Sequence, residues 1–490
     1  METHELTEAE RRVWRAYPRG ETVDFRGAPG EDPAAGRVWG AERTVRAAVL
    51  RALLLRDDRE DGEIASVNVF GARVTGSLNL KYAELDIPVR LRGCFFERVP
   101  ELYSCRMPLL SLQGSVLPGL SAAALRLDGT LRLNDCRFTG AVRLSGARVG
   151  GAVVLDGAEV RPSEADVPGE PLVKLNQAEI TDDLRAARLR VRGQVRLTGA
   201  VIGGSVFLSD AELSGPGGTA LQAERLTVGA DLHAMRLRAE GRLNVRGSQI
   251  PGQLILTSAR LTCPGGTALR ASSCTVGELW LKDGAVVRGA VNLRRSQLDR
   301  LHAPPGVWPE TVRLDGLTYT TLAPHIPAER RLEVLRRDGD GYVPFAYEQL
   351  TAAYRRAGDD AAARTVQLAK QRRHRALLPR YARVWGVVQD VTVGYGYRPV
   401  RAALWLLSLL LVGTTAYVVR PPRPLKPAEA PEFSPVFYTL DLLLPIVDFG
   451  QERAFTSGGA LQWLAYALVI LGWVLATTIA AGITRSLSRQ

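Results

Sequence analysis

Cysteine and histidine are both scarce in this chain, with five of each among 490 residues. The cysteines are odd in number and show no C-x-x-C spacing, and the histidines form no pair at metal-ligand spacing. We therefore expect no disulfide framework, no metal and no bound cofactor. The cysteines are interpreted as reduced, small apolar residues of a cytoplasmic domain. They are Cys94, Cys105, Cys136, Cys263 and Cys274.

Nucleotide-binding and catalytic motifs are missing as well. No G-x-G-x-x-G follows a strand and opens a helix, and no G-x-x-x-x-G-K-[ST] is present, so a Rossmann or P-loop site is not favoured. Acidic pairs such as Asp57-Asp58 and Asp182-Asp183 fall at expected helix ends or chain corners, where solvated carboxylates are common. We predict that the chain is not an enzyme.

The N-terminus, METHELTEAERRVWRAYPRG, has no apolar core of the kind found in signal peptides. We therefore expect the large N-terminal part of the chain to lie in the cytoplasm.

Two long apolar runs stand near the C-terminus, at 402–419 and 460–483, and neither contains a charged residue. Each is about long enough to cross a ~30 Å hydrocarbon core. The sequence predicts a two-pass anchor over 400–490 in the cytoplasmic membrane, with both termini cytoplasmic and an external loop at 420–459. Two helices buried in a soluble core are the alternative, but runs that are apolar all round favour lipid.

The flank before the first run is strongly basic and holds a single acidic residue, Asp390. This pattern is typical of the cytoplasmic side of a membrane protein and attracts anionic lipid head groups. No nucleic-acid-binding motif accompanies it, so we expect no nucleic-acid partner. The predicted membrane-surface residues are Lys370, Arg372, Arg373, Arg375, Arg380, Arg383, Trp385, Arg398 and Arg401.

Two further segments bear on the membrane interpretation. Residues 392–396 read TVGYG, the selectivity-filter sequence of potassium channels, but they precede the first run instead of lying between the two. We interpret them as a bend in an interfacial segment at 379–399. In the outer loop, 434–450 is apolar enough to dip into the outer leaflet, with Asp441 and Asp448 as candidate pore or loop residues.

Residues 63–322 follow a different sequence pattern, of the form G-[AS]-x-[VI]-x-G-x-[VL]-x-L. Gly193, Gly241 and Gly289 stand 48 residues apart, and SGPGGTAL at 214–221 returns 48 residues later as TCPGGTAL. The constant period predicts a mainly β chain folded as a right-handed β-helix, whose 48-residue unit is two coils. Val, Leu, Ile and Ala should point inward and polar residues outward. A β-sandwich would need no constant period.

The open ends of such a solenoid require caps. We predict an N-terminal helical cap over 1–62, with its main helix at 38–55, and a helical hairpin linker over 323–378. Its helices are expected at 328–338, 344–358 and 359–375, with Asp359 as an N-cap.

Several segments carry a family resemblance. YEQLTAAYRRAGDDAAARTVQLAKQRR (347–373), GYGYRPVRAALW (394–405) and FYTLDLLLPIVDFGQ (437–451) resemble a family of actinobacterial membrane proteins, often labelled membrane-associated oxidoreductases. The membrane protein of Streptomyces-type contractile injection systems belongs to that family. The β-helix is also similar to pentapeptide-repeat proteins, without their strict five-residue motif.

The resemblance implies a cytoplasmic docking protein that lets contractile injection particles engage the membrane, leading to cell death. Its expected partners are anionic lipids and a protein particle. One rival hypothesis is a homo-oligomeric pore or channel, or a general membrane scaffold. The other is a redox enzyme, which is the least favoured because no cofactor motif is present.

Overall fold

A computed structural model describes residues 6–28, 30–56, 62–379, 399–426, 430–444 and 447–487, without the side chains of 216–217, 399–402 and 478–487. The chain divides into two compact units, Met1–Gly358 and Asp359–Gln490. Each unit is described by itself below.

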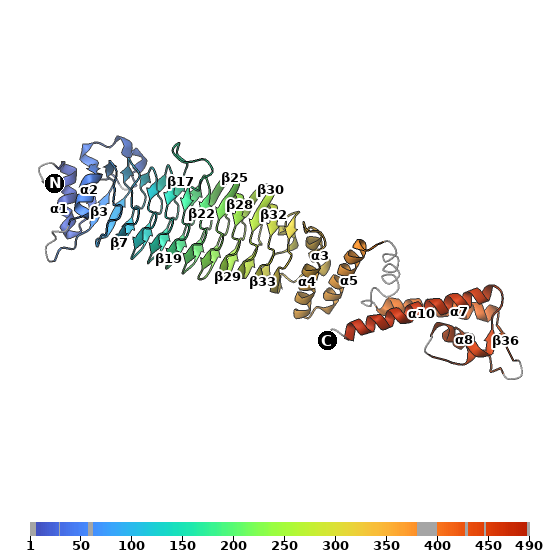
Figure 1. Cartoon of the computed structure of the whole chain (residues 1–490). Coiled ribbons are helices and arrows are strands. Elements are labelled where there is room, and N and C mark those ends of the chain that lie inside the picture. Colours follow the sequence, from blue (N-terminus) through green and yellow to red (C-terminus); the bar gives the residue numbers. More distant parts are fainter. Residues whose placement is uncertain are drawn as a thin grey trace. The chain divides into compact units, whose positions relative to one another are not determined.

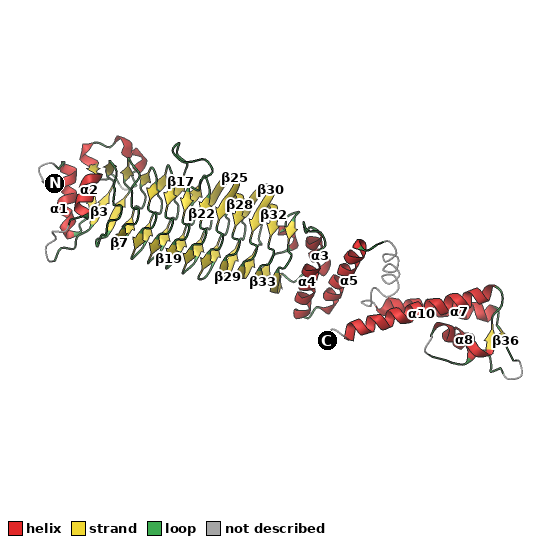
Figure 2. Cartoon of the chain, viewed as in Figure 1, coloured by secondary structure: helices red, strands yellow, loops and turns green. Residues whose placement is uncertain are grey.

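The first unit is a β-solenoid of about 12 turns with helices at its ends (Figures 1 and 2). A regular coil has four two-residue strands, as in β11 (Arg126–Leu127), β12 (Leu131–Arg132), β13 (Arg137–Phe138) and β14 (Val142–Arg143). The next strand, β15 (Arg148–Val149), pairs in parallel with β11. Each coil thus adds two strands to each of two parallel sheets.

The two sheets hold 19 and 16 strands. Besides β11, β12 and β15, the larger sheet contains β1 (Val23–Asp24), β3 (Val67–Phe70), β5 (Val89–Arg92), β7 (Arg106–Met107), β8 (Leu110–Ser111), β16 (Val153–Val154), β19 (Glu179–Ile180), β20 (Leu184–Arg185), β23 (Val201–Ile202), β24 (Val206–Phe207), β26 (Thr227–Val228), β27 (Leu232–His233), β29 (Gln249–Ile255), β31 (Thr275–Trp280), β33 (Gln297–His302) and β35 (Thr318–Ala323). Besides β13 and β14, the smaller sheet contains β2 (Thr44–Arg46), β4 (Arg73–Thr75), β6 (Phe95–Phe96), β9 (Val116–Leu117), β10 (Leu120–Ser121), β17 (Glu159–Val160), β18 (Val173–Lys174), β21 (Arg190–Val191), β22 (Val195–Arg196), β25 (Glu212–Gln222), β28 (Arg238–Asn244), β30 (Arg260–Arg270), β32 (Val286–Asn292) and β34 (Val312–Arg313).

The strand register explains the 48-residue period of the sequence. Thr227 pairs with Gln249, 22 residues on, and Gln249 pairs with Thr275, a further 26 residues on. The longer coil contains β30, whose TCPGGTAL segment accounts for the extra residues. Two unequal coils therefore make up one sequence repeat.

The solenoid core consists of the inward residues of the short strands and corners. Leu125, Leu127, Leu131 and Leu133 are all buried, whereas Arg126 and Arg132 between them are exposed. The corners need a left-handed backbone, which Gly146 supplies at φ 66° in one coil and Gln177 at φ 54° in the next. Because a residue other than glycine can fill this corner, the glycine spacing alone does not mark every coil.

The N-terminal end contains a helix within 5–18, as the sequence predicts, but the segment 38–55 is not one continuous helix. The structure has α1 (Glu8–Ala16), η2 (Tyr17–Arg19), η3 (Pro33–Val38), η4 (Ala41–Arg43) and α2 (Ala47–Leu54). Between η4 and α2, strand β2 pairs in parallel with β4 and buries Val45 completely. The helix prediction was wrong for 38–46. Residues 44–46 form a strand because pairing with a distant strand outweighs helical spacing.

Helices also cover the last coil. After η5 (Pro305–Val307), the chain forms α3 (Ala328–Arg336) and α4 (Pro344–Arg356). Arg331 of α3 donates to the Ala303 carbonyl at 2.5 Å, and Gln349 of α4 donates to the Tyr319 carbonyl at 2.5 Å. These bonds tie the helices to the end of the sheet and cover strand edges that could otherwise pair with another chain.

The second unit is helical. It contains α5 (Asp360–Leu377), α7 (Pro399–Val419), α8 (Pro435–Leu443), α9 (Gln451–Ala454) and α10 (Ala460–Leu487). A short antiparallel pair, β36 (Arg423–Pro424) with β37 (Phe455–Thr456), joins the segments beside α7 and α10. Asp359 caps α5 as predicted, because its side chain accepts from the Ala362 amide at 2.9 Å.

Candidate functional site

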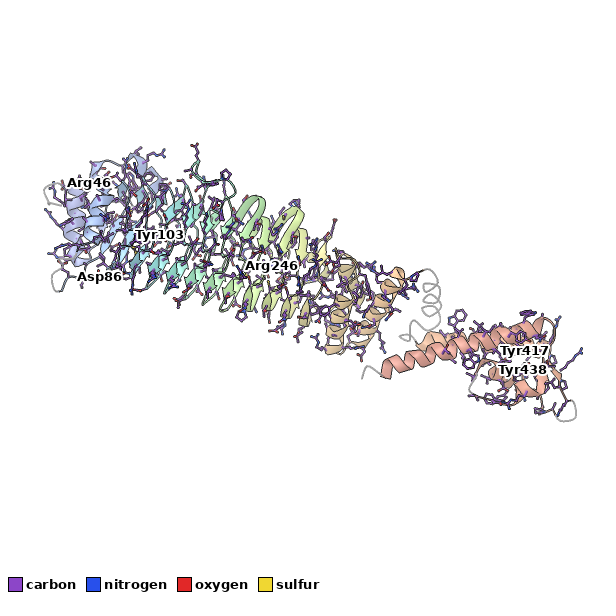
Figure 3. The ribbon with its side chains drawn as sticks, viewed as in Figure 1. Arg46, Asp86, Tyr103, Arg246, Tyr417 and Tyr438 are labelled. Carbon is purple, nitrogen blue, oxygen red and sulfur yellow. The ribbon has the colours of Figure 1, made fainter. Side chains whose placement is uncertain are left out.

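The candidate site is the apolar part of the second unit, where α7, α8 and α10 pack together. The rings of Tyr417 on α7 and Tyr438 on α8 meet edge to face with centroids 4.8 Å apart (Figure 3). Leu443 of α8 and Leu468 of α10 complete the middle of the buried cluster. The short helix α8 is therefore held by contacts with both long helices.

Two glycines let α8 come close to its neighbours. A Cβ atom at Gly472 of α10 would overlap the backbone carbonyl of Leu443, and a Cβ at Gly413 of α7 would overlap the side chain of Thr439. Small residues at helix contacts allow such close approach in apolar surroundings. We did not recognise either glycine from the sequence, although an isolated glycine inside an apolar helical run was the available signal.

The outward faces of α7 and α10 are apolar too. Trp463, Ile470 and Trp473 on α10 are between 54 and 76 % exposed, and only 22 % of the segment Ala460–Thr477 is buried. On α7, Leu404 and Leu411 are about 60 % exposed. A helix that belonged to a water-soluble core would bury most of this surface, so these faces suit lipid or another apolar partner.

Length and composition distinguish the two long helices. Within the described residues, Ala460–Thr477 is the one segment long and apolar enough to cross a membrane, whereas the apolar part of α7, Ala403–Val419, is shorter. One such helix is weak support for membrane association. The two-pass anchor and the cytoplasmic orientation of the termini stay predictions.

Asp441, a predicted loop or pore residue, is a buried structural group. It lies near the end of α8 and is 5 % exposed. Its carboxylate accepts backbone amides from Phe449 at 2.5 Å, Gln451 at 2.7 Å and Glu452 at 3.1 Å. Three charge-assisted bonds close the connection between α8 and α9 and hold it against α8.

Asp448, the other predicted residue, is placed differently. One of its oxygens accepts from the Gly450 amide at 2.8 Å, and the other forms an ion pair with Arg453 at 2.9 Å. Its side chain is 49 % exposed. Asp448 can therefore meet water or a ligand, while Asp441 cannot do so without opening the loop.

The predicted membrane-surface cations are only partly described. Lys370, Arg372, Arg373 and Arg375 lie in the last turns of α5, where Arg372 and Arg373 are exposed. Basic side chains at this end complement the helix dipole. Arg380, Arg383, Trp385 and Arg398 lie outside the described residues, as do 392–396, and the side chain of Arg401 is not described.

The described residues contain no group of histidine, cysteine and acidic side chains that could hold a metal ion. Burial raises the pKa of Cys94, Cys105 and Cys136 to about 12 and that of Cys274 to about 11, which keeps these thiols protonated. Comparisons with protein-family models, curated proteins and solved structures found no match for this chain.

Proposed function

We propose that this protein is a membrane-anchored docking protein, whose solenoid presents a rigid surface in the cytoplasm while α7 and α10 attach it to the membrane. The observation that carries the proposal is the exposed apolar surface of Trp463, Ile470 and Trp473 on α10 and of Leu404 and Leu411 on α7. Burying such side chains in hydrocarbon contributes roughly 25 cal/mol per Å². The basic end of α5 would add attraction to anionic lipids.

The solenoid surface supports a role in binding a protein. Arg137, Glu159, Arg190, Glu212 and Arg238 occupy successive coils in one strand register. Arg190 pairs with Glu159 at 3.0 Å, and Arg238 pairs with Glu212 at 3.1 Å. These outward charges are largely compensated within the row, so this row does not form a continuous positive stripe of the kind that nucleic acid requires. By the family resemblance, we propose a contractile injection particle as the partner and cell death as the outcome.

Two measurements test the proposal. Deleting 400–490 should move the protein from the membrane fraction to the soluble fraction, and its recovery in a carbonate-washed membrane pellet would refute the anchor. Purified injection particles should co-float with vesicles that carry the full chain but not with empty vesicles. Equal flotation with both kinds of vesicle would refute the docking role while leaving the anchor standing.

A second candidate function is an oligomeric pore, which the position of α8 favours. Backbone that leaves a helix at membrane depth must be buried in protein or line water. The chain leaves α8 at Leu443, packed against Gly472 in the interior of α10, and Val447 and Asp448 beyond it are exposed. Another copy of the chain could cover these residues and form a water-filled path beside Asp448.

Conductance across planar bilayers tests the pore. The full chain should conduct cations, and Asp448→Asn should lower the conductance because it removes an exposed charge beside the path. Asp441→Asn is a poor probe because it would open the loop. Bilayers that stay silent with a correctly folded, inserted protein would exclude the pore.

A further inference from the structure

A hollow of about 570 Å³ lies between the N-terminal segment 26–43 and the first coils of the solenoid. Four arginines line it, together with Trp39 and Phe70. All the residues that line the hollow belong to the first unit. It was not expected from the sequence, because its walls come from residues more than 60 positions apart. The four arginines are Arg26, Arg43, Arg92 and Arg137.

Three of the four cations have carboxylate partners. These pairs are Arg26 with Asp24 at 2.6 Å, Arg43 with Glu31 at 2.8 Å, and Arg137 with Asp32 at 2.9 Å. Glu31, Asp32 and Asp135 also line the hollow, so it is not uniformly positive. The charges of Glu31 and Asp32 are each offset by the arginine that they contact.

Arg92 is the exception. Among the residues that the structure describes, no carboxylate pairs with it. Its Nη2 donates to Oδ1 of Asn68 at 2.8 Å, while its Nε is buried without a hydrogen-bond partner. A buried guanidinium nitrogen without an acceptor is unfavourable, because it has lost water without gaining a replacement.

Aromatic stacking fixes the orientation of Arg92. Its guanidinium lies 3.8 Å from the centre of the Phe70 ring, and the guanidinium of Arg26 lies 4.5 Å from the same centre. The Asn68 bond and the Phe70 ring together hold the planar group in place. A fixed fork of this kind loses little side-chain freedom when it binds an anion.

The electrostatic surroundings of Arg92 favour an added anion. Burial is the main cause that lowers its pKa, and the positive charges of Arg90 and Arg26 lower it further. The charged guanidinium is therefore less stable here than in water, although it stays protonated at neutral pH. A negative group beside Arg92 would offset both the burial and the repulsion between neighbouring cations.

We propose that this hollow is a binding site for a phosphate group on a small ligand, with Arg92 as its main contact. A guanidinium can donate hydrogen bonds to an oxyanion from both of its Nη atoms, and the Asn68 bond uses one of these donors in Arg92. Arg26 lies on the same ring but is paired with Asp24, so Arg92 carries the one positive charge among the four arginines that no carboxylate of the described residues compensates. The proposal does not depend on membrane attachment or on the docking role.

Equilibrium dialysis of the full chain in detergent, with radiolabelled inorganic phosphate as the probe, tests this site. We expect saturable binding of one phosphate per chain. Arg92→Gln should weaken it at least tenfold, and Arg92→Lys should weaken it less because the charge is kept without the fork. Arg98→Gln is the matched control, since Arg98 is exposed and does not line the hollow.

Three results would overturn the proposal. One is the absence of saturable phosphate binding. Another is unchanged binding by Arg92→Gln when its melting curve matches that of the natural protein, which shows that it is folded. The third is displacement of phosphate by an equal concentration of acetate, which would show that the site does not select a phosphate group.

Discussion

The contact between Glu10 and Arg46 should control the stability of the N-terminal cap (Figure 3 labels Arg46). The Glu10 carboxylate is completely buried. Its Oε1 accepts from the backbone amide of Arg46 at 3.0 Å and from the Nε of Arg46 at 2.7 Å. Its Oε2 accepts from the amide of Thr7 at 2.9 Å and from the Nη2 of Arg46 at 2.7 Å. One side chain thus joins the start of α1 to β2, the first strand of the smaller sheet in sequence.

Replacing Glu10 by glutamine keeps one acceptor oxygen and loses the two bonds made by the other. A hydrogen bond to a charged group contributes about 1.5–3 kcal/mol, and Arg46 is half-exposed and can return to water. We therefore expect Glu10→Gln to destabilise the cap by roughly 2–3 kcal/mol, which is about a 30- to 150-fold increase in local opening. We expect this increase in local opening over the whole of α1.

Hydrogen exchange followed by mass spectrometry measures the opening. Peptides from α1 and β2 should exchange about 30- to 150-fold faster in Glu10→Gln, while peptides from the middle of the solenoid stay unchanged. Glu8→Gln is the control, because Glu8 is exposed on the same turn. Exchange of the α1 peptide within threefold of the natural protein would contradict the role assigned to Glu10.

The same contact predicts a pH dependence. Burial alone would raise the pKa of Glu10, but the bonds from Arg46 and Thr7 outweigh it, so the pKa is lowered below its ordinary value. A lowered carboxyl pKa gives a stabilisation that is full above the unfolded value and is lost as pH falls through the folded value. The natural protein and Glu10→Gln should therefore converge in strongly acidic solution. A constant difference down to pH 2 would contradict this explanation.

Three further predictions concern other parts of the chain. Asp441→Ala should speed hydrogen exchange around α9 at least tenfold, because three backbone amides lose their acceptor. Asp448→Ala should change the exchange less, and equal effects would contradict the structural role assigned to Asp441. Gly472→Leu should lower the melting temperature of the second unit in detergent, because the added side chain displaces α8. Gly458→Ala is the control, since nothing lies within 4 Å of the added Cβ atom. A melting curve for Gly472→Leu that matches the natural protein would contradict the close contact. Maleimide at pH 8 should label the half-buried Cys263 of the folded protein but leave the four buried cysteines unlabelled until denaturation; native labelling of all five would contradict their burial.

The solenoid could be predicted because its repeat is local in sequence. Each coil buries the same apolar row, so the alternation and the 48-residue spacing recur along the chain. The first coil could not be predicted in the same way. Val45 lies in a segment with helical spacing, and only its pairing with Val74 makes it a strand. Pairing between strands that are distant in sequence produces no periodic pattern of residues, so it could not be predicted from the sequence.

The candidate site was predicted less completely than the fold. The two apolar runs form α7 and α10, as expected, because helix formation satisfies their backbone without help from other segments. The function of Asp441 depends on closure of a loop that brings Phe449 and Gln451 onto its carboxylate. The phosphate hollow likewise depends on placing Arg26 beside Arg92. Sequence spacing did not indicate either arrangement.

Asp441 is buried and Asp448 is exposed, and this difference decides which of the two can test the pore. A charged residue that lined a pore would need access to water, and Asp441 is instead fully used by backbone amides inside the unit. Loss of conductance in an Asp441 variant would therefore report a damaged fold as readily as a missing charge. Asp448 is exposed and is held only by an ion pair and one amide bond, so its neutralisation changes charge with little change in packing. The pore and the simple anchor can thus be separated by Asp448→Asn, which should leave membrane attachment intact in either case and alter ion flow only if a pore exists.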